Sequence, residues 1–176
     1  IQWVREPAVL EPAEATFSGA PVLHIERPNN ILTEGYVASG NAKGALLNSV
    51  HVIENRYKTP FIEHAYIEPE AGYAFRDGDR IIIQGCTQAP FMNKDSIAEI
   101  LGVGSEDVRI IPTGCGGGFG SKLDLSYQPY IALAAWKLNQ PVGIIYSRHE
   151  SMLTTTKRHP SEISIKVGCD ENFKIT

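Results

Sequence analysis

One segment of the chain, Thr113–Lys122, has a composition suited to holding a ligand. It reads Thr-Gly-Cys-Gly-Gly-Gly-Phe-Gly-Ser-Lys, so five of its ten residues are glycine. Glycine lets a backbone approach a ligand closely and direct successive N–H groups toward an anion. The plain alternative is a tight strand-to-helix connection without a ligand, but so many glycines would cost conformational entropy for no packing benefit. The sequence therefore predicts that this segment, the glycine loop, binds a ligand.

The glycine loop matches neither of the common phosphate-binding motifs. A P-loop needs Gly-Lys followed by Ser or Thr, whereas Gly120 is followed by Ser121 and then by Lys122. The dinucleotide motif Gly-x-Gly-x-x-Gly also fails, because Phe119 or Ser121 stands where its third glycine belongs. A nucleotide-binding α/β domain is therefore the weakest functional hypothesis.

A second candidate lies between Gly85 and Pro90, where a predicted strand leads into a helix. Ligands of α/β sheets commonly sit at such strand ends. Gln88 would offer an amide donor there, suited to an oxo or carbonyl oxygen. The alternative is that the Gln88 amide only caps the start of the helix, and the segment by itself favours this alternative.

A third candidate, Glu63–Glu70, contains three carboxylates and His64. In an extended strand Glu63 and His64 point to opposite faces, and His64 and Glu68 lie too far apart to bind one metal ion. This predicts structural or supporting roles rather than a metal site. The charged stretches 148–150 and 157–160 are interpreted as solvated loops, the second of which could bind an anion.

The elements that must position these segments alternate between helices and strands. A linker is expected over residues 1–20, and a tight Asp-Gly turn is expected at Asp77-Gly78-Asp79. Strands are predicted over 31–39, 50–57, 73–76, 80–83, 108–111, 142–146 and 162–167, and helices over 42–47, 90–101 and 130–138. The 130–138 helix is apolar nearly all round, which predicts that it is fully buried. The pattern favours an α+β fold with a mixed β-sheet and packed helices.

The composition is that of a folding globular chain. Lys and Arg number 16 against 20 Asp and Glu, which gives a net charge of −4, and 43% of the residues are hydrophobic. No basic patterning suggests nucleic acid as a partner, and no apolar run is long enough for a membrane span. Cys86, Cys115 and Cys169 form no Cys-x-x-Cys pair, which favours a reducing, cytoplasmic setting. The start without Met and the end in a predicted returning strand suggest a piece of a longer chain.

Several motifs together resemble one family. They occur in order at residues 60–70, 86–90, 116–122, 132–136 and 158–160. In this combination the chain resembles, from about Glu6 to its end, the molybdopterin-binding subunit of the xanthine dehydrogenase and aldehyde oxidase family. The resemblance implies a molybdenum-cofactor-binding-domain-like fold, with an entry segment over 1–20 and a partial domain over 21–176.

The resemblance also implies roles for individual residues. Gln88 would lie near the apical oxo ligand of a molybdenum–molybdopterin cofactor, and Gly118, Phe119 and Gly120 would place their backbone beside the metal and the pterin. The general base, a glutamate, would lie beyond Thr176, so the piece alone would be inactive. Leu123 would belong to the substrate pocket, where xanthine-specific members carry a purine-binding glutamate and aldehyde-type members an apolar residue. In contrast, residues 68–72 look closer to bacterial purine hydroxylases.

The implied function is hydroxylation of a purine or another N-heterocycle with water as the oxygen source. An aldehyde oxidoreductase of the same family and a non-catalytic binding or assembly module without the metal are the alternatives. The implied partners are the remainder of the molybdopterin-binding chain and domains or subunits carrying [2Fe-2S] clusters and FAD. The small-molecule substrate would be a heterocycle or an aldehyde, with neither nucleic acid nor membrane involved.

Overall fold

The computed structural model describes residues 2–176. The chain forms two compact units: one contains the residues up to Thr59 together with Pro160–Thr176, and the other is Pro60–His159. All three candidate segments fall in the second unit. The predicted division into a linker over 1–20 and a domain over 21–176 stays a prediction.

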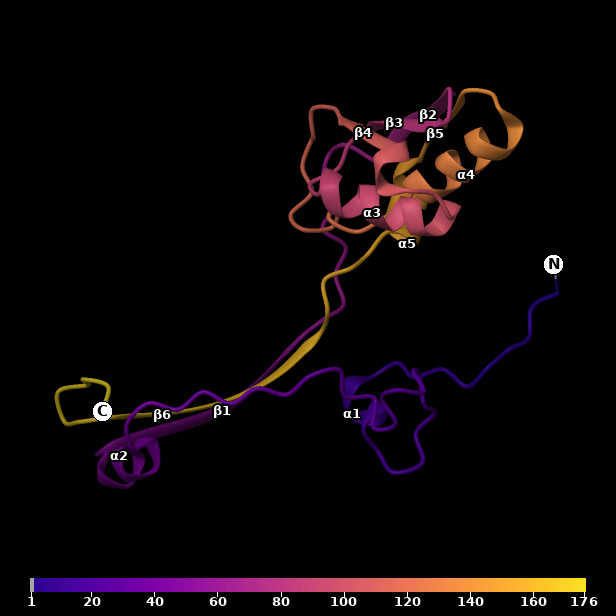
Figure 1. Ribbon diagram of the computed structural model, residues 1–176. Coiled ribbons are helices and arrows are strands. Elements are labelled where there is room, and N and C mark those ends of the chain that lie inside the picture. Colours follow the sequence, from indigo (N-terminus) through magenta and orange to yellow (C-terminus); the bar gives the residue numbers. More distant parts are fainter. Residues whose placement is uncertain (1) are drawn as a thin grey trace. The chain divides into compact units, whose positions relative to one another are not determined.

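The second unit is built on a four-stranded sheet (Figure 1). Its strands are β2 (Ala71–Asp77), β3 (Arg80–Gly85), β4 (Val108–Pro112) and β5 (Val142–Ile145), in the spatial order β4-β3-β2-β5. β3 and β4 are parallel, whereas β2 is antiparallel to both β3 and β5. Gly78, with φ 61°, makes the tight turn between β2 and β3. The predicted mixed sheet and the predicted hairpin are confirmed.

Helices α3 (Pro90–Leu101) and α4 (Gln128–Leu138) cover one face of this sheet. Pro90 occupies the first turn of α3, and the helix ends at Gly102, whose φ is 68°. A short 3-10 turn (Ser105–Asp107) and α5 (Arg148–Thr154) complete the unit. The core between helices and sheet consists mainly of small and aliphatic side chains: Ala74, Ile81, Ile83, Val108, Ile97, Ala98, Ile131, Ala132 and Ala135.

Tyr127, just before α4, fixes the end of β3. Its buried ring lies beneath Gly72 and Gly85, and a Cβ on Gly85 would come within 2.1 Å of the Tyr127 hydroxyl. The hydroxyl donates to the Cys86 carbonyl at 3.0 Å. Only glycine leaves room for this close approach, so the two glycines and the tyrosine together set where the chain leaves the sheet toward Gln88.

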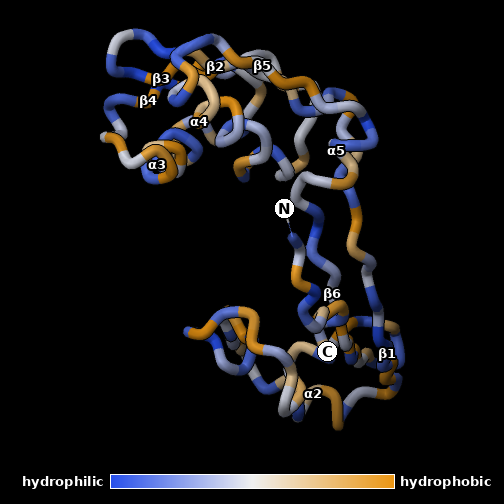
Figure 2. Tube along the Cα trace, turned by 90° about the vertical axis from the view of Figure 1, so that its right-hand side faces the viewer, coloured by the Kyte–Doolittle hydropathy of each residue, from blue (hydrophilic) through white to orange (hydrophobic). Residues whose placement is uncertain are grey.

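The first unit contains a long two-stranded ribbon. β1 (His51–Thr59) pairs antiparallel with β6 (Ser161–Cys169) along its whole length. Most side chains of both strands are exposed, and hydrophilic and hydrophobic residues mix along them (Figure 2). The unit also contains α1 (Pro12–Ala15) and α2 (Ala42–Asn48), which is capped by Asn41. After a turn, Ile175 forms a bridge with Cys169, in keeping with the predicted returning segment.

Four expectations about secondary structure are wrong. Residues 31–39 form no strand, because β-propensity without a neighbouring strand or a covering layer leaves Tyr36 and Val37 almost fully exposed. Helix α4 is buried on one side only, with Tyr130 exposed, because none of residues 2–176 covers its outer side. β5 is an edge strand whose Ile145 is exposed rather than a buried strand. Residues 148–150 begin α5 instead of forming a loop.

The predicted α+β fold class is nevertheless confirmed. Within residues 2–176, no helix has both the length and the apolar character needed to cross a membrane.

Candidate functional site

The glycine loop and Gln88 meet directly. The Gln88 side-chain oxygen, Oε1, accepts hydrogen bonds from the backbone N–H of Gly120 at 3.2 Å and of Lys122 at 3.3 Å. The Gln88 backbone N–H donates in turn to the Lys122 carbonyl at 2.9 Å. Two segments more than thirty residues apart in the sequence are thereby held as one structure. Gln88 therefore does more than cap α3, which was the plain alternative.

The backbone of the glycine loop adopts conformations that L-residues rarely take. Gly117 and Gly120 have φ values of 100° and 98°, and Phe119 between them has φ 53°. A Cβ on Gly118 would lie 2.3 Å from Gln88 Oε1, so no other residue fits there without moving the amide. The Phe119 side chain is 74% exposed, so the turn carries an aromatic ring outward. The loop therefore has a specific backbone conformation that depends on its glycines, and it does more than connect two elements.

The Gln88 amide is left with an unused donor. Because Oε1 accepts both loop N–H groups, the Nε2 group points away from them, and no acceptor for it occurs in the part of the chain that the structure describes. Gln88 is also exposed at the surface. The arrangement can therefore donate one hydrogen bond to a ligand atom placed beside Gly118 and Phe119.

A buried ion pair holds the other end of the loop. Lys122, only 4% exposed, places Nζ 2.7 Å from Glu68 Oε2 and 2.9 Å from the Glu68 carbonyl oxygen. The same Glu68 Oε2 accepts from the Gly116 N–H at 2.8 Å, and the Glu68 N–H donates to the Gly116 carbonyl. Sequence patterns assigned no role to Lys122 beyond failing the P-loop test. The one sequence signal for a structural role of Lys122 was its position as a charged residue at the end of a glycine-rich segment.

The ion pair stabilises the charged forms of both partners. Burial by itself would raise the pKa of Glu68, but the hydrogen bonds from Lys122 and from the Gly116 N–H outweigh it and lower the Glu68 pKa. Burial would likewise lower the pKa of Lys122, but the hydrogen bond and the negative charge of Glu68 raise it instead. A carboxylate and an ammonium thus persist together beneath the loop.

The segment around Glu63–Glu70 is not the predicted strand. Apart from a single bridge between Ile62 and Arg158, it is irregular, and Ala65 has φ 52°. Glu63 pairs with Lys157 at 2.6 Å, with both side chains nearly buried. Lys157 is therefore engaged rather than solvated, which corrects that expectation. Within residues 2–176, no three His, Cys, Asp or Glu side chains gather in a way that could hold a metal ion.

Leu123 directly follows the loop and is tied to α3 through its backbone. Its carbonyl accepts from the buried Asn93 side chain at 2.8 Å, and its N–H donates to the Gly120 carbonyl at 3.3 Å. The leucine side chain is 42% exposed and free to line an adjacent space. Its predicted place in a substrate pocket stays a prediction.

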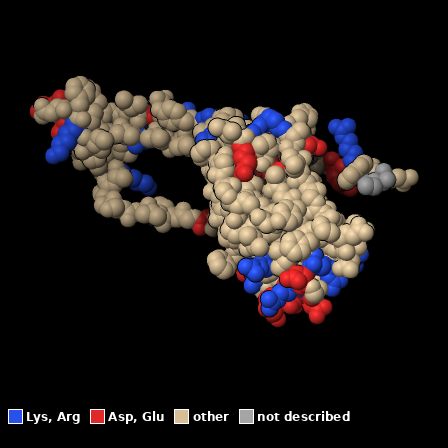
Figure 3. Space-filling view, turned by 90° about the horizontal axis from the view of Figure 1, so that it is seen from above, with Lys and Arg blue, Asp and Glu red and all other residues tan. Residues whose placement is uncertain are grey.

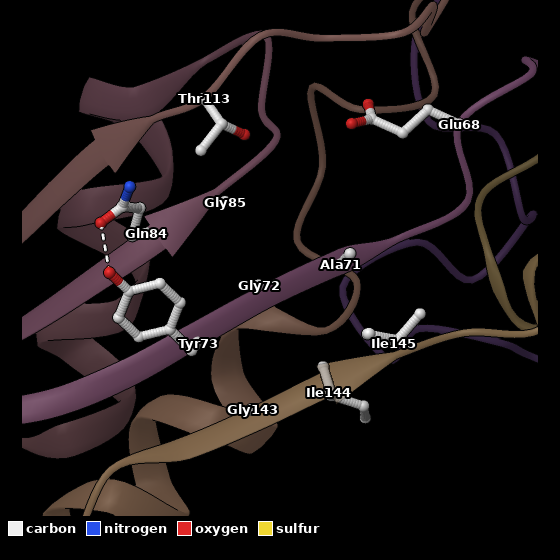
Figure 4. Close-up of a pocket in the computed structure, with 10 residues that line it drawn as sticks. All are labelled: Glu68, Ala71, Gly72, Tyr73, Gln84, Gly85, Thr113, Gly143, Ile144 and Ile145. Carbon is white, nitrogen blue, oxygen red and sulfur yellow. Dashed lines mark hydrogen bonds between the residues drawn. The ribbon is translucent and has the colours of Figure 1, made fainter.

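A cavity of about 640 Å³ opens on the face of the sheet that α3 and α4 leave bare. Its walls include Tyr73 and Ile145 on one side and Glu68 and Thr113 on the other (Figure 4). Few charged side chains are visible on this side of the unit (Figure 3). Glu68 thus stands between the glycine loop and an otherwise largely apolar cavity.

Comparisons with known proteins give a consistent result. Residues 23–176 match the family model described as the molybdopterin cofactor-binding domain. The large molybdopterin subunit of nicotinate dehydrogenase from Eubacterium barkeri is 32% identical over 157 residues, which are 89% of this chain and 36% of that protein. A probable xanthine dehydrogenase subunit from Bacillus subtilis is 35% identical over 162 residues, which are 92% of this chain and 22% of that protein.

The fold comparison agrees. The aldehyde oxidoreductase of Desulfovibrio gigas superposes with a TM-score of 0.88 at 21% identity, over 97% of this chain and 19% of that protein. The chain therefore spans only about a fifth to about a third of the length of these relatives.

Proposed function

Because the chain belongs to the molybdopterin cofactor-binding domain family, we propose that the glycine loop and Gln88 form part of the binding site for a molybdenum–molybdopterin cofactor. Gly118, Phe119 and Gly120 place their backbone beside the cofactor, and Gln88 donates from Nε2 to the oxo ligand of the metal. The observation that carries the proposal is the Gln88 amide, whose oxygen is fixed by Gly120 and Lys122 while its N–H₂ group is unused.

The residues present fit such a group. Gly118 lets the Gln88 amide lie directly against the loop backbone, which places the amide donor beside the surface that a ligand would contact. The donor of Gln88 is neutral and held in place before a ligand arrives, so it would suit an electron-rich oxygen atom of the cofactor. The cofactor supplies the redox chemistry when bound, and this chain supplies orientation and hydrogen bonds.

The parent protein is, in this proposal, a molybdenum hydroxylase that oxidises a purine or another N-heterocycle with water as the oxygen source. Support comes from the relatives named as nicotinate and xanthine dehydrogenase subunits. The general-base glutamate would lie beyond Thr176. Electrons would leave through [2Fe-2S] clusters and FAD on other domains or subunits, and the complex would work in the cytoplasm.

Leu123 favours a second candidate, an aldehyde oxidoreductase of the same family. An exposed leucine directly after the loop offers no hydrogen bond to a purine, whereas it suits an apolar substrate. Turnover of a purine and of an aromatic aldehyde by the parent protein, compared with its Leu123→Glu variant, separates the two. A heterocycle hydroxylase prefers the purine before substitution; an aldehyde enzyme prefers the aldehyde and loses that preference in the variant.

The test of the main proposal is Gln88→Glu in the full-length protein. A carboxylate still accepts from the two loop N–H groups but has no hydrogen to donate, so folding and molybdenum content are kept while turnover falls about 10²- to 10³-fold. Gln140→Glu, in the exposed turn after α4, is the matched control and leaves turnover unchanged. Parent protein without molybdenum would favour the non-catalytic module instead, and full activity of Gln88→Glu would refute the role of Gln88.

A further inference from the structure

Lys122 is the only charged residue of the glycine loop, and its ammonium is buried. A buried ammonium loses its hydration, and a protein retains such a charge only where partners replace the lost water. Lys122 has these partners in Glu68, through both the carboxylate and the carbonyl oxygen. The ring of Tyr66 lies below it, 4.6 Å from Nζ to the ring centre.

Glu68 joins this charge to the backbone of the loop. Its Oε2 binds Lys122 Nζ and the Gly116 N–H at once, and its own backbone N–H binds the Gly116 carbonyl. A Cβ on Gly116 would lie 2.5 Å from the Glu68 Cβ, so the contact requires glycine. Three hydrogen bonds and a close approach therefore fix Gly116 relative to Lys122, six residues later in the chain.

Tyr66 is itself held in place. Its ring is 1% exposed, and its hydroxyl donates to Glu70, a carboxylate that is equally buried. The surface on which the Lys122 ammonium rests is therefore rigid. The loop between Gly116 and Lys122 contains the three residues that would face the cofactor, Gly118, Phe119 and Gly120.

We propose that the Glu68–Lys122 ion pair is a positioning device that closes the glycine loop and holds it in the form that receives the cofactor. The inference rests on the proposed function only for the identity of the ligand, since the closure of the loop is a property of this chain. Without Lys122, no partner holds the Glu68 carboxylate in place against the Gly116 N–H, so the loop opens at that end and the cofactor dissociates faster.

The test uses Lys122→Met, which keeps the length of the side chain and removes its charge. In cofactor-free full-length protein, amide hydrogen exchange over residues 116–122 rises at least tenfold, and in holoenzyme the rate of molybdenum loss on dialysis rises by a similar factor. Arg76→Met is the matched control, because it removes a partly buried cation that pairs with Asp79 near the end of β2 that leads into Gly78. It lowers the melting temperature without changing either readout for the loop.

The double variant Glu68→Gln/Lys122→Met separates positioning from a general loss of packing. If the two charges act as one device, the double variant lies closer to wild type than Lys122→Met does, because no unpaired carboxylate remains. Additive effects, or unchanged loop exchange in Lys122→Met, would overturn the proposal. Should Lys122→Met fail to fold, Glu68→Gln gives the same comparison, because it breaks the same charge pair and leaves the buried Lys122 ammonium without its counter-charge. Absence of molybdenum from the wild type would refute the proposed function but leave the exchange test intact.

Discussion

The two ends of the glycine loop are held by different kinds of chemistry. At Gly116 the anchor is charged and partly buried: Glu68 Oε2 accepts both the backbone N–H and the ammonium of Lys122. At Gly120 the anchor is neutral and exposed: the Gln88 amide oxygen accepts two backbone N–H groups. Lys122 takes part in both, with its side chain at one end and its backbone at the other.

This difference separates two tasks. The charged end derives its strength from the burial of Lys122, whose ammonium is already paired with Glu68. The neutral end is weaker, but its anchor keeps a free donor at the surface. The Glu68–Lys122 ion pair therefore holds the loop in place, whereas the Gln88 amide keeps a hydrogen-bond donor available at its surface.

The largest effect is expected from a methyl group at the neutral end. In Gly118→Ala the new Cβ would lie 2.3 Å from Gln88 Oε1, so the amide must leave its position. Because the exposed Gln88 side chain can swing away, we expect a loss of about 1 kcal/mol in the free energy of unfolding from its broken hydrogen bonds, together with loss of molybdenum from the holoenzyme. Urea unfolding and metal analysis measure the two.

The matched control for that substitution is Gly114→Ala. A Cβ at Gly114 would meet nothing within 4 Å, so stability and molybdenum content stay at wild-type values. Equal losses in the two variants would mean that the loop needs flexibility at every glycine rather than space at Gly118.

A smaller effect follows from pH, and it acts on the charged end alone. The pKa of Glu68 is lowered below its ordinary value of 4.5, so its contribution is present above that pH and is lost as pH falls through the lowered value. The pKa of Lys122 is raised above 10.5, so its contribution is lost only as pH rises through that raised value. Gln88 does not titrate.

Amide exchange, corrected for its intrinsic pH dependence, measures this asymmetry. Between pH 4.5 and 10.5 both ends keep constant protection. Below that range the Gly116 amide loses protection severalfold before the Gly120 amide does. Simultaneous loss at both amides would show that the loop opens as one unit and that the two anchors are not independent.

Sequence patterns predicted the neutral end better than the charged end. A glycine-rich segment is a local signal and was expected beside a ligand, whereas the amide at the strand end gained that expectation only from the family resemblance. Their joining through Gln88 Oε1 depends on how β3 and the loop are brought together, which local patterns do not encode. Glu68 was placed on an extended strand, whereas the irregular backbone around Ala65 directs it toward Gly116 instead.

The fold shows the same limit. The hairpin at Gly78 and the helix from Pro90 to Gly102 were predictable because turn and cap residues act locally. The expected strand over 31–39 and the fully buried α4 were wrong, because exposure depends on which elements lie alongside. Whether a strand finds a partner, and whether a helix is buried, depends on contacts between residues far apart in the sequence, which composition does not encode.

The smallest effect concerns the residue between the two anchors. Phe119 has φ 53°, a conformation that costs an L-residue about 1–2 kcal/mol, and glycine relieves this cost but adds about 0.5–1 kcal/mol of unfolded-chain entropy. Phe119→Gly should therefore raise the free energy of unfolding of cofactor-free protein by roughly 0.5–1 kcal/mol relative to Phe119→Ala. The exposed ring contributes little packing in either variant.

This gain depends on both anchors. A strained backbone persists only where its surroundings hold it. In a Lys122→Met background the Gly116 end is open, Phe119 can relax, and glycine brings no advantage over alanine. Denaturant unfolding of the four variants measures the coupling. A gain of the same size in both backgrounds would mean that the Gln88 end alone imposes the conformation of Phe119, and the charged end would then matter for stability but not for the shape presented to the ligand.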